Sequence, residues 1–330
     1  MTYKIAACCQ LGYIGNKDKF EQYDSCSMGT VRRIDMLKLC GLGKDDVDQL
    51  TDELVNQHFA VMQAKLMPVV LRNLKALRAQ LTLVSSMPER MRAFRISSDL
   101  LPLYTHPVLG KLYDSAVLHA IQCHLHNTGL IISKHDIRVS SHPSQFTTLS
   151  SDRDEVIDAS IVDLEHHVMI MESLGLSPST CVINIHANGK SFTLPERARH
   201  LFPWLSLEND EKKAGHAKVL QLCETYGIRY VFDHHHYYCE TGDLIDFHGD
   251  DWQRIKATWC GQRPLMHLSQ ARGDANFKDQ CAHSDTITDM DLVHYISAFL
   301  YEADLELEAK HKNVAVADLY NKLKLIEESV

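Results

Sequence analysis

Residues 204–236 read WLSLENDEKKAGHAKVLQLCETYGIRYVFDHHH, and this stretch decides the fold. A short apolar run, Trp204–Leu207, is followed by a stretch with helical spacing, Glu211–Tyr226, and then by a second β-rich run, Arg229–Phe232. A strand, a helix and a strand in this order predict two parallel strands joined by a crossover helix. The stretch therefore indicates an α/β protein with a parallel sheet.

The same alternation runs through the whole chain. Short apolar or β-rich runs predict strands at Lys4–Cys9, Ala93–Ile96, Ile137–Ser141, Cys181–Ile185, Trp204–Leu207, Arg229–Phe232, Pro264–Leu268 and Ala303–Leu307. Helical spacing predicts helices at Thr51–Gln80, Lys111–Asn127, Glu155–Leu174, Glu211–Tyr226, Met290–Leu300 and Val314–Glu328. Eight such units in 330 residues favour a closed barrel, so we expect a single (β/α)8 TIM-type barrel with residues 1–330 as one domain.

The composition excludes several classes of protein. The chain has 330 residues, 45% of them hydrophobic, which is enough for a large core. It has no run of about 18 apolar residues and no signal-peptide cleavage pattern. We therefore expect no membrane segment and a cytoplasmic protein of a bacterium or a virus-infected cell. The ten cysteines include no Cys-x-x-Cys pair, so we expect reduced thiols and no disulfide framework.

The net charge of −9 at first argues against a nucleic-acid partner. It is a global sum, however, whereas binding depends on local fields, and bound divalent ions would add positive charge at one face. Basic residues also cluster locally, at Arg90, Arg92 and Arg95, at Lys190, Arg197 and Arg199, and at Arg254, Lys256 and Arg263. Each cluster alone is more often a solvated face than a binding patch.

Metal-ligand side chains follow seven of the eight predicted strands. In chain order they are His106, His142, His186, Glu208, Asp233 with His236, His267 with His283, and Glu308. The C-terminal ends of all strands of a β/α barrel meet at one face, where active sites are found. The sequence therefore predicts that these side chains converge on one site.

Histidine nitrogens and carboxylate oxygens together suit manganese, zinc and iron ions, and a bridging carboxylate can hold two ions close together. Such a cluster can bind a phosphate, lower the pKa of a bound water and neutralise a leaving oxygen, which are the needs of phosphodiester hydrolysis. The many histidines favour manganese or zinc over magnesium, which prefers oxygen ligands.

Each residue also has a plainer interpretation. A lone histidine after a strand is most often a hydrogen-bonding residue, Glu208 can start a helix, and Asp233 can cap one. Strand alternation would turn at least one of His234 and His235 away from the site. If these residues bound no metal, every one of these separate interpretations would have to be true at once. The metal site is therefore favoured.

Nine short stretches carry a further signal. They are Leu11–Tyr13, Phe94–Pro102 with His106-Pro107, Arg138–Phe146, Asn184–His186, Leu207–Glu211, Phe232–His236, His267–Ser269, Ala282–Asp285 and Leu307–Lys310. Any one is weak, but all nine, in this order over roughly residues 10–312, resemble the UV-damage endonuclease family.

The resemblance implies a barrel akin to the apurinic-site endonucleases, with up to three divalent ions, manganese first and zinc as the alternative. The implied metal ligands are His106, His142, His186, Glu208, Asp233, His236, His267, His283 and Glu308. Among them we expect Glu308, His142 and His267 to be catalytic. The implied reaction is incision 5′ to UV photoproducts and other helix-distorting lesions in double-stranded DNA, leaving a 3′-hydroxyl and a 5′-phosphate. We expect a monomer that needs no nucleotide cofactor.

The family's lesion probe resembles a Gln-Tyr pair, which here is Gln145-Phe146. Phenylalanine keeps the flat face that can stack on a base or fill the gap beside a displaced nucleotide, but it lacks the phenol hydroxyl. Its plainer interpretation is a core aromatic. Tyr13 and Asn16 would line the same cleft, although the family more often has one further residue between them. Lys190 would meet a phosphate or remain solvated.

One position departs from the resemblance. Two residues before His267 we expect a lysine, thought to be carboxylated so that it helps to hold the metals, but the chain has Leu265. Residues two apart on a strand point the same way, so both should face the barrel mouth. We therefore expect weaker binding of one metal, with water or a nearby carboxylate such as Asp285 filling the gap.

Three rival functions follow from the same residues. An apurinic-site endonuclease or a metal-dependent sugar isomerase would use a similar barrel, and a binding protein with a degraded metal site would fit the Leu265 departure. Isomerase sites resemble carboxylate-dominated clusters with few aromatics at the rim. The six predicted histidine ligands and the Gln145-Phe146 pair speak against that alternative.

Overall fold

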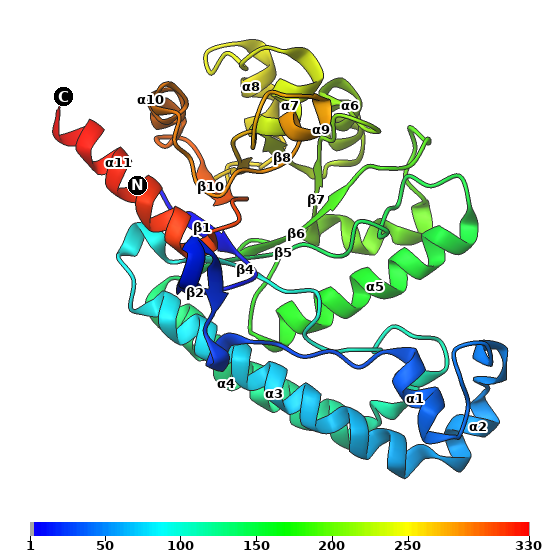
Figure 1. Cartoon of the computed structure of the whole chain (residues 1–330). Helices are drawn as coiled ribbons and strands as arrows, with labels where there is room; N and C mark the ends of the chain where they lie inside the picture. The colour runs from blue at the N-terminus through cyan, green and yellow to red at the C-terminus, as the bar shows by residue number, and fades with distance from the viewer. Residues whose placement is uncertain (1–2, 330) are drawn as a thin grey trace.

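The computed structural model describes residues 3–329, and a closed barrel of parallel strands forms its centre (Figure 1). In hydrogen-bonded order the barrel strands are β1 (Ile5–Cys8), β10 (Asp304–Leu307), β9 (Leu265–Leu268), β8 (Arg229–Asp233), β7 (Leu205–Glu208), β6 (Cys181–His186), β5 (Arg138–Ser141) and β4 (Ala93–Ile96). All eight predicted strands are present, and the predicted TIM-type barrel is confirmed.

Helices surround the barrel on its outside (Figure 1). They are α1 (Arg33–Leu39), α2 (Asp52–Gln57), α3 (Phe59–Ser85), α4 (Ser115–His135), α5 (Asp154–Ser173), α6 (His216–Tyr226), α7 (His234–Thr241), α8 (Asp250–Ala257), α9 (Phe277–Gln280), α10 (Met290–Phe299) and α11 (Lys312–Glu328). A small antiparallel hairpin, β2 (Gly12–Ile14) and β3 (Phe20–Gln22), follows β1. Within residues 3–329, no helix has the length and apolar character needed to span a bilayer.

Three predicted helices have other boundaries in the structure. The helix predicted at Thr51–Gln80 is interrupted at His58, which separates α2 from α3. Helix α4 begins later than predicted, because the Asp114 carboxylate accepts a backbone amide at 2.9 Å and caps the helix there. Helix α6 lacks its predicted first turn, because residues 210–214 form a hydrogen-bonded turn of their own.

Strand β6 shows how the sequence builds both faces of the barrel wall. Ile183 and Ile185 point outward into the main core between strands and helices, whereas Val182 belongs to a separate apolar cluster. Successive side chains on a strand alternate between faces, so Asn184 points inward with Val182. Both faces are buried, as expected for a parallel sheet covered by helices.

The barrel interior changes from apolar to polar along the strands. Val182, Val231 and Leu265 form the apolar layer together with Trp259. Toward the C-terminal strand ends the buried side chains are polar, and each is at most 1% exposed: Asn184, Ser206, Glu208, His267 and Glu306. Buried polar groups are unfavourable unless they are paired, so this layer needs partners.

Candidate metal centre and DNA-binding face

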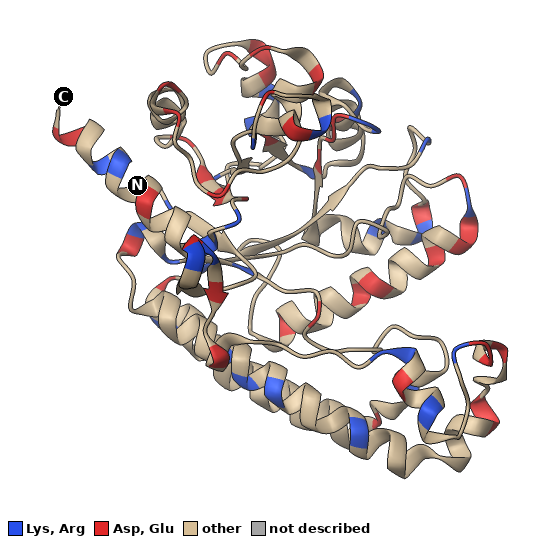
Figure 2. Cartoon of the chain, in the orientation of Figure 1, with Lys and Arg blue, Asp and Glu red and all other residues tan. Residues whose placement is uncertain are grey.

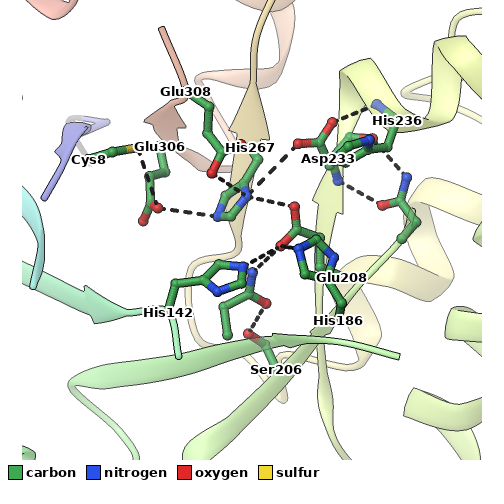
Figure 3. Close-up of polar contacts among 12 residues, drawn as sticks. Cys8, His142, His186, Ser206, Glu208, Asp233, His236, His267, Glu306 and Glu308 are labelled. Carbon is green, nitrogen blue, oxygen red and sulfur yellow. Dashed lines mark hydrogen bonds and ion pairs between the residues drawn. The ribbon is translucent and has the colours of Figure 1, made fainter. Parts of the chain in front are cut away.

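Glu208, at the end of β7, is the hub of the polar layer (Figure 3). Its Oε1 atom lies 3.0 Å from Nδ1 of His267, and its Oε2 atom lies 3.1 Å from Nε2 of His142. Nε2 of His186 lies 4.0 Å from the same Oε2, to which Asn184 donates at 2.5 Å. The two oxygens of one carboxylate thus face two groups of ligand residues.

Asp233 and Glu308 complete the second group. Nδ1 of His267 lies 3.9 Å from Oδ2 of Asp233 and 3.7 Å from Oε1 of Glu308. One ligand atom from each of Glu208, Asp233, His267 and Glu308 lies within 4.8 Å of the others. His283 extends this group, because its Nδ1 lies 3.7 Å from Oε2 of Glu308.

His236 lies at the edge of both groups. Its ring centroid is 6.2 Å from that of His186 and 6.3 Å from that of His283. Its Nδ1 pairs with Oε2 of Glu211 at 2.6 Å. The structure therefore brings eight of the nine predicted ligands together, from six different strands and their following loops.

His106 is the predicted ligand that the structure leaves apart. Its Nδ1 accepts hydrogen bonds from the backbone amides of Val108 and Leu109, each at 3.2 Å, within its own loop. Among residues 3–329, no recorded contact joins its ring to the other eight. Its role as a ligand stays a prediction.

Asp233 has both of the roles considered from the sequence. Its Oδ1 atom accepts the His236 backbone amide at 2.7 Å and caps α7. Its Oδ2 atom is buried without a hydrogen bond in the described chain and faces the cluster. Glu208, in contrast, is not at a helix start, because it ends a strand and α6 begins only at His216.

The neighbours of Asp233 do not follow strand alternation, because α7 begins at His234. The His234 ring contacts Tyr295 at a centroid distance of 5.4 Å, and the His235 ring lies 5.6 Å from His283. His234 is therefore directed into the packing between helices and away from the ligand groups.

The carboxylates of the cluster shift the pKa values of two of its histidines. Burial alone would lower the pKa of His267, but the carboxylates of Glu208 and Glu306 raise it to about 10. Burial would also lower the pKa of His236, but Asp233 and Glu211 outweigh it and raise that pKa to about 11. Excess negative charge in a buried site, together with the unpaired Asp233 oxygen, fits ligation of divalent metals.

The sequence analysis missed Glu306 and misjudged Arg95. Nη1 of Arg95 lies 2.8 Å from Oε1 of Glu306 and 2.6 Å from Oε1 of Glu308, inside the barrel. Arg95 is therefore not part of a basic surface patch. A signal for Glu306 was present, since Asp304, Glu306 and Glu308 are spaced two apart and alternation points all three inward.

Leu265 faces the barrel interior, as predicted, but not its mouth. It is 2% exposed and packs with Val182, Val231 and Trp259 in the apolar layer. The physical reason is the strand rise, since two residues place it about 6–7 Å below His267. The side chain of Asp285, suggested as a substitute, is 61% exposed and lies 3.6 Å from Lys310.

A groove beside the centre contains the predicted lesion-binding residues Gln145, Phe146 and Lys190. Phe146 is 78% exposed, so the interpretation as a core aromatic is wrong. The groove is also lined by residues that the sequence analysis missed, namely Phe192, Lys212, Lys213 and Lys218. The residues that line the groove follow three different strands, β5, β6 and β7. No single stretch of sequence could therefore predict the groove.

The arginine clusters noted in the sequence are mostly paired with acids. Arg90 binds Glu327 and Arg254 binds Glu224, and both pairs lie on the outer helices. Figure 2 shows basic and acidic residues interspersed over these helices. The interpretation as solvated faces therefore fits Arg254 and Arg197, whereas Arg95 and Arg263 pair with buried carboxylates and Lys190 lines the groove.

Tyr13 and Asn16 belong to the hairpin region after β1, on the side of the C-terminal strand ends. Tyr13 is 44% exposed, and its hydroxyl donates to Oε2 of Glu21 at 2.9 Å. Asn16 is exposed at the start of a short 3-10 turn. Contact of either residue with DNA stays a prediction.

The chain is similar to known proteins in sequence and in fold. A UV DNA damage endonuclease of Bacillus velezensis is 29% identical over 247 residues, which cover 71% of this chain and 75% of the relative. The crystal structure of SacUVDE has a TM-score of 0.71 at 22% identity and covers 99% of this chain and 98% of its own. Endonuclease IV from Thermus thermophilus has a TM-score of 0.53 at 14% identity, covering 77% and 95%, which shows a shared fold. The model of the UV-endonuclease UvdE family matches residues 10–329, and the chain belongs to this family.

Proposed function

We propose that the chain is a manganese-dependent endonuclease that incises double-stranded DNA 5′ to UV photoproducts and other helix-distorting lesions. One observation carries the proposal: eight predicted metal ligands converge at the barrel mouth beside a groove with exposed aromatics and lysines. Family membership supports the endonuclease activity, the ligand cluster supports a divalent metal, and the incision side follows from the family resemblance alone. The expected products carry a 3′-hydroxyl and a 5′-phosphate.

The chain offers places for up to three divalent ions, with zinc as the alternative to manganese. Glu208 is suited to bridge two of them, because one oxygen faces His142 and His186 and the other faces His267. Bound ions would neutralise phosphate charge and lower the pKa of a water nucleophile. His236 and His283 are available at the edge for a third.

We propose that one of these ions binds more weakly than the others. Leu265 offers no donor to the layer below His267, so one anionic oxygen expected from the resemblance is absent at this position. Counting metals across a manganese titration tests this. Three ions with equal, tight affinity would show that Leu265 has no such effect.

The residues proposed as catalytic are Glu308, His142 and His267. Each is positioned by a partner that leaves it little freedom: Glu308 by Arg95 at 2.6 Å, and both histidines by Glu208. Held in this way, they would keep the ions and the scissile phosphate in one geometry, which lowers the barrier because little reorganisation is needed.

The groove would hold the damaged duplex. Phe146 and Gln145 would probe the distortion, since lesions lower the cost of unstacking and an aromatic face stacks on any base. Lys190 and its neighbours would contact phosphates, which orient the duplex without reading its sequence. Tyr13 and Asn16 would approach from the hairpin after β1.

Supercoiled plasmid tests this proposal. UV-irradiated, depurinated and untreated plasmids are incubated with the purified chain and Mn²⁺, and nicked circles are counted on a gel. We expect nicking of the irradiated plasmid, none of the untreated one, and none after chelation with verified metal removal. Nicking of only the depurinated plasmid would favour the apurinic-site alternative, and no nicking at any manganese concentration would favour a degraded site.

A further inference from the structure

A buried polar network lies directly beneath the metal ligands, and the proposed reaction does not use it. Its centre is Glu306 in β10, which is opposite His267 in the register of β10 with β9. Both side chains are fully buried, at 0% exposure. A buried carboxylate needs strong partners, so its contacts indicate what it does.

Three side chains hold the Glu306 carboxylate in place, and Figure 3 shows one of them, Cys8. The Ser140 hydroxyl donates to Oε2 at 2.6 Å, and Nη1 of Arg95 lies 2.8 Å from Oε1. The Cys8 thiol approaches Oε1 at 3.8 Å. Arg95 also pairs with Glu308 at 2.6 Å, so one guanidinium connects Glu306 to a predicted metal ligand.

Glu306 is not itself placed to bind an ion. The ligand atoms of Cys8, Glu306 and Glu308 lie within 4.8 Å of one another, as in a metal site. However, both oxygens of Glu306 already have partners, Oε1 in Arg95 and Oε2 in Ser140. Glu308 differs, because only its Oε1 contacts Arg95, while its Oε2 lies toward the predicted ligand His283. Glu306 must therefore act on the centre through another residue.

That residue is His267, whose two ring nitrogens have different surroundings. Nδ1 faces the predicted ligands, at 3.0 Å from Glu208 and 3.7 Å from Glu308. Nε2 is buried without a hydrogen bond in the described chain, and Oε1 of Glu306 lies 3.5 Å from it. A ring that binds an ion through Nδ1 must carry its proton on Nε2. A buried N–H without an acceptor is unfavourable, and Glu306 is the acceptor within reach.

We propose that Glu306 is a positioning residue of the metal centre: its carboxylate accepts a hydrogen bond from the Nε2–H of His267, which directs Nδ1 toward the ions, and through Arg95 it fixes Glu308. The inference rests on the proposed metal-dependent function. A carboxylate behind a metal-binding histidine fixes its tautomer and its orientation and makes it a better ligand.

Metal affinity tests the inference without any activity assay. The metal-free chain is titrated with Mn²⁺, and free Mn²⁺ is measured from its electron paramagnetic resonance signal. Loss of such an outer carboxylate typically weakens metal binding by about 10- to 100-fold, so Glu306→Gln should show a loss in that range. Glu327→Gln is the matched control, because Glu327 pairs with Arg90 on the outside of the barrel.

A second pair of variants tests the same inference in case Glu306→Gln does not fold. Ser140 and Ser141 are adjacent in β5, but Ser140 donates to Glu306 whereas Ser141 bonds to His167 at 2.9 Å, outside the barrel. Loss of one hydrogen bond that holds the carboxylate should weaken Mn²⁺ binding about threefold to tenfold in Ser140→Ala. Ser141→Ala should bind as the unchanged chain does.

The outcomes separate the inference from the proposed function. Failure of the unchanged chain to bind Mn²⁺ or Zn²⁺ would overturn both. Tight binding by the unchanged chain with equal binding by Glu306→Gln would overturn the inference alone. If Glu306→Gln does not fold, the Ser140→Ala result decides, and equal affinity of Ser140→Ala and Ser141→Ala would overturn the inference.

Discussion

The Phe146 ring is 78% exposed at the rim of the lysine-lined groove, where it contributes little to the packing of the core. We therefore predict that Phe146→Ala keeps the fold and narrows the difference in affinity between damaged and intact DNA. Losing a stacking face typically costs about 1–3 kcal/mol of binding free energy. A fluorescence titration with matched damaged and undamaged duplexes measures the change.

Tyr301→Ala is the control for Phe146→Ala, since Tyr301 is 82% exposed and precedes β10, at the opposite end of the barrel from the groove. Its discrimination ratio should equal that of the unchanged chain. If Phe146→Ala also leaves the ratio unchanged, Phe146 does not read the lesion.

Arg95 holds Glu308 inside the cluster, and Glu208 holds His142 there. We therefore expect that no neighbouring side chain takes over the role of either residue. We predict that Glu308→Ala or His142→Ala leaves a folded chain that still binds damaged DNA. Cutting should slow by at least ~10²-fold, the scale for removal of a charge-stabilising element. Single-turnover cleavage with saturating enzyme measures this, with Glu328→Ala as the control. Normal cutting by either variant would remove that residue from the site.

The side chains that sequence analysis missed share a physical cause. The strand-end ligands could be predicted, because each lies at or close to the C-terminal end of a predicted strand. Glu306 lies within such a run, and Arg95 resembles a surface charge until the barrel closes around it. The groove residues Lys212 and Lys218 follow β7, whereas Phe146 follows β5, so these residues line one groove only in the folded barrel. The pattern of apolar runs and polar residues along the chain therefore predicts the ligands. It does not predict the side chains that contact them from other strands of the barrel.

At the scale of elements, the β8–α7 junction combines two functions in Asp233. Oδ1 caps α7 at 2.7 Å, while Oδ2 faces the cluster. Asp233→Asn keeps a cap acceptor but removes the charge, whereas Asp233→Ala removes both. We predict that both variants lose Mn²⁺ binding, and that Asp233→Ala is less stable than Asp233→Asn by about 1 kcal/mol because it also loses the cap.

Urea unfolding of the two metal-free variants measures that difference. The comparison isolates the cap, since neither variant carries the buried charge. Equal stability of the two variants would show that Asp233 does not stabilise α7. Undiminished Mn²⁺ binding by Asp233→Asn would remove its carboxylate from the centre.

The strands of the barrel were easier to predict from the sequence than the short helices and the hairpin outside it. All eight strands are short apolar or β-rich runs that are largely buried on both faces, and such runs indicate burial in a sequence. Helices α1, α7, α8 and α9 and the β2–β3 hairpin were not predicted. Helix α7 consists of HHHYYCET, which has no helical apolar stripe, and it forms because Asp233 caps it after β8. Helix α9 likewise begins at a capping residue, Asn276, and such caps are not detected by a search for apolar periodicity.

For the whole molecule, the cluster makes stability depend on pH and metal. The pKa values of His236 and His267 are raised to about 11 and about 10 in the metal-free fold, above the ordinary value of about 6.5. Protonation of these two groups stabilises the fold fully below about pH 6.5, and this contribution is lost as pH rises toward those values. We predict that the metal-free chain loses stability between pH 6.5 and 9.

Bound Mn²⁺ would take over the charge that the histidine protons supply. The loss between pH 6.5 and 9 should then shrink, and saturation at 100 times the Kd adds about 2.7 kcal/mol of stability. Urea unfolding at both pH values, with and without Mn²⁺, provides the measurement. A metal-free chain that is equally stable at both would contradict the raised pKa values.

The central claim is that one barrel mouth joins a metal centre to a lesion-binding groove, and a defined duplex tests it most directly. A duplex with one UV photoproduct, labelled at the 5′ end of the damaged strand, is incubated with the chain and Mn²⁺ and resolved at single-nucleotide resolution. We predict one labelled product that ends in a 3′-hydroxyl at the 5′ side of the lesion, absent from the undamaged duplex, after metal removal and with Glu308→Ala. Equal cutting of the undamaged duplex, or incision that persists without metal, would contradict the account.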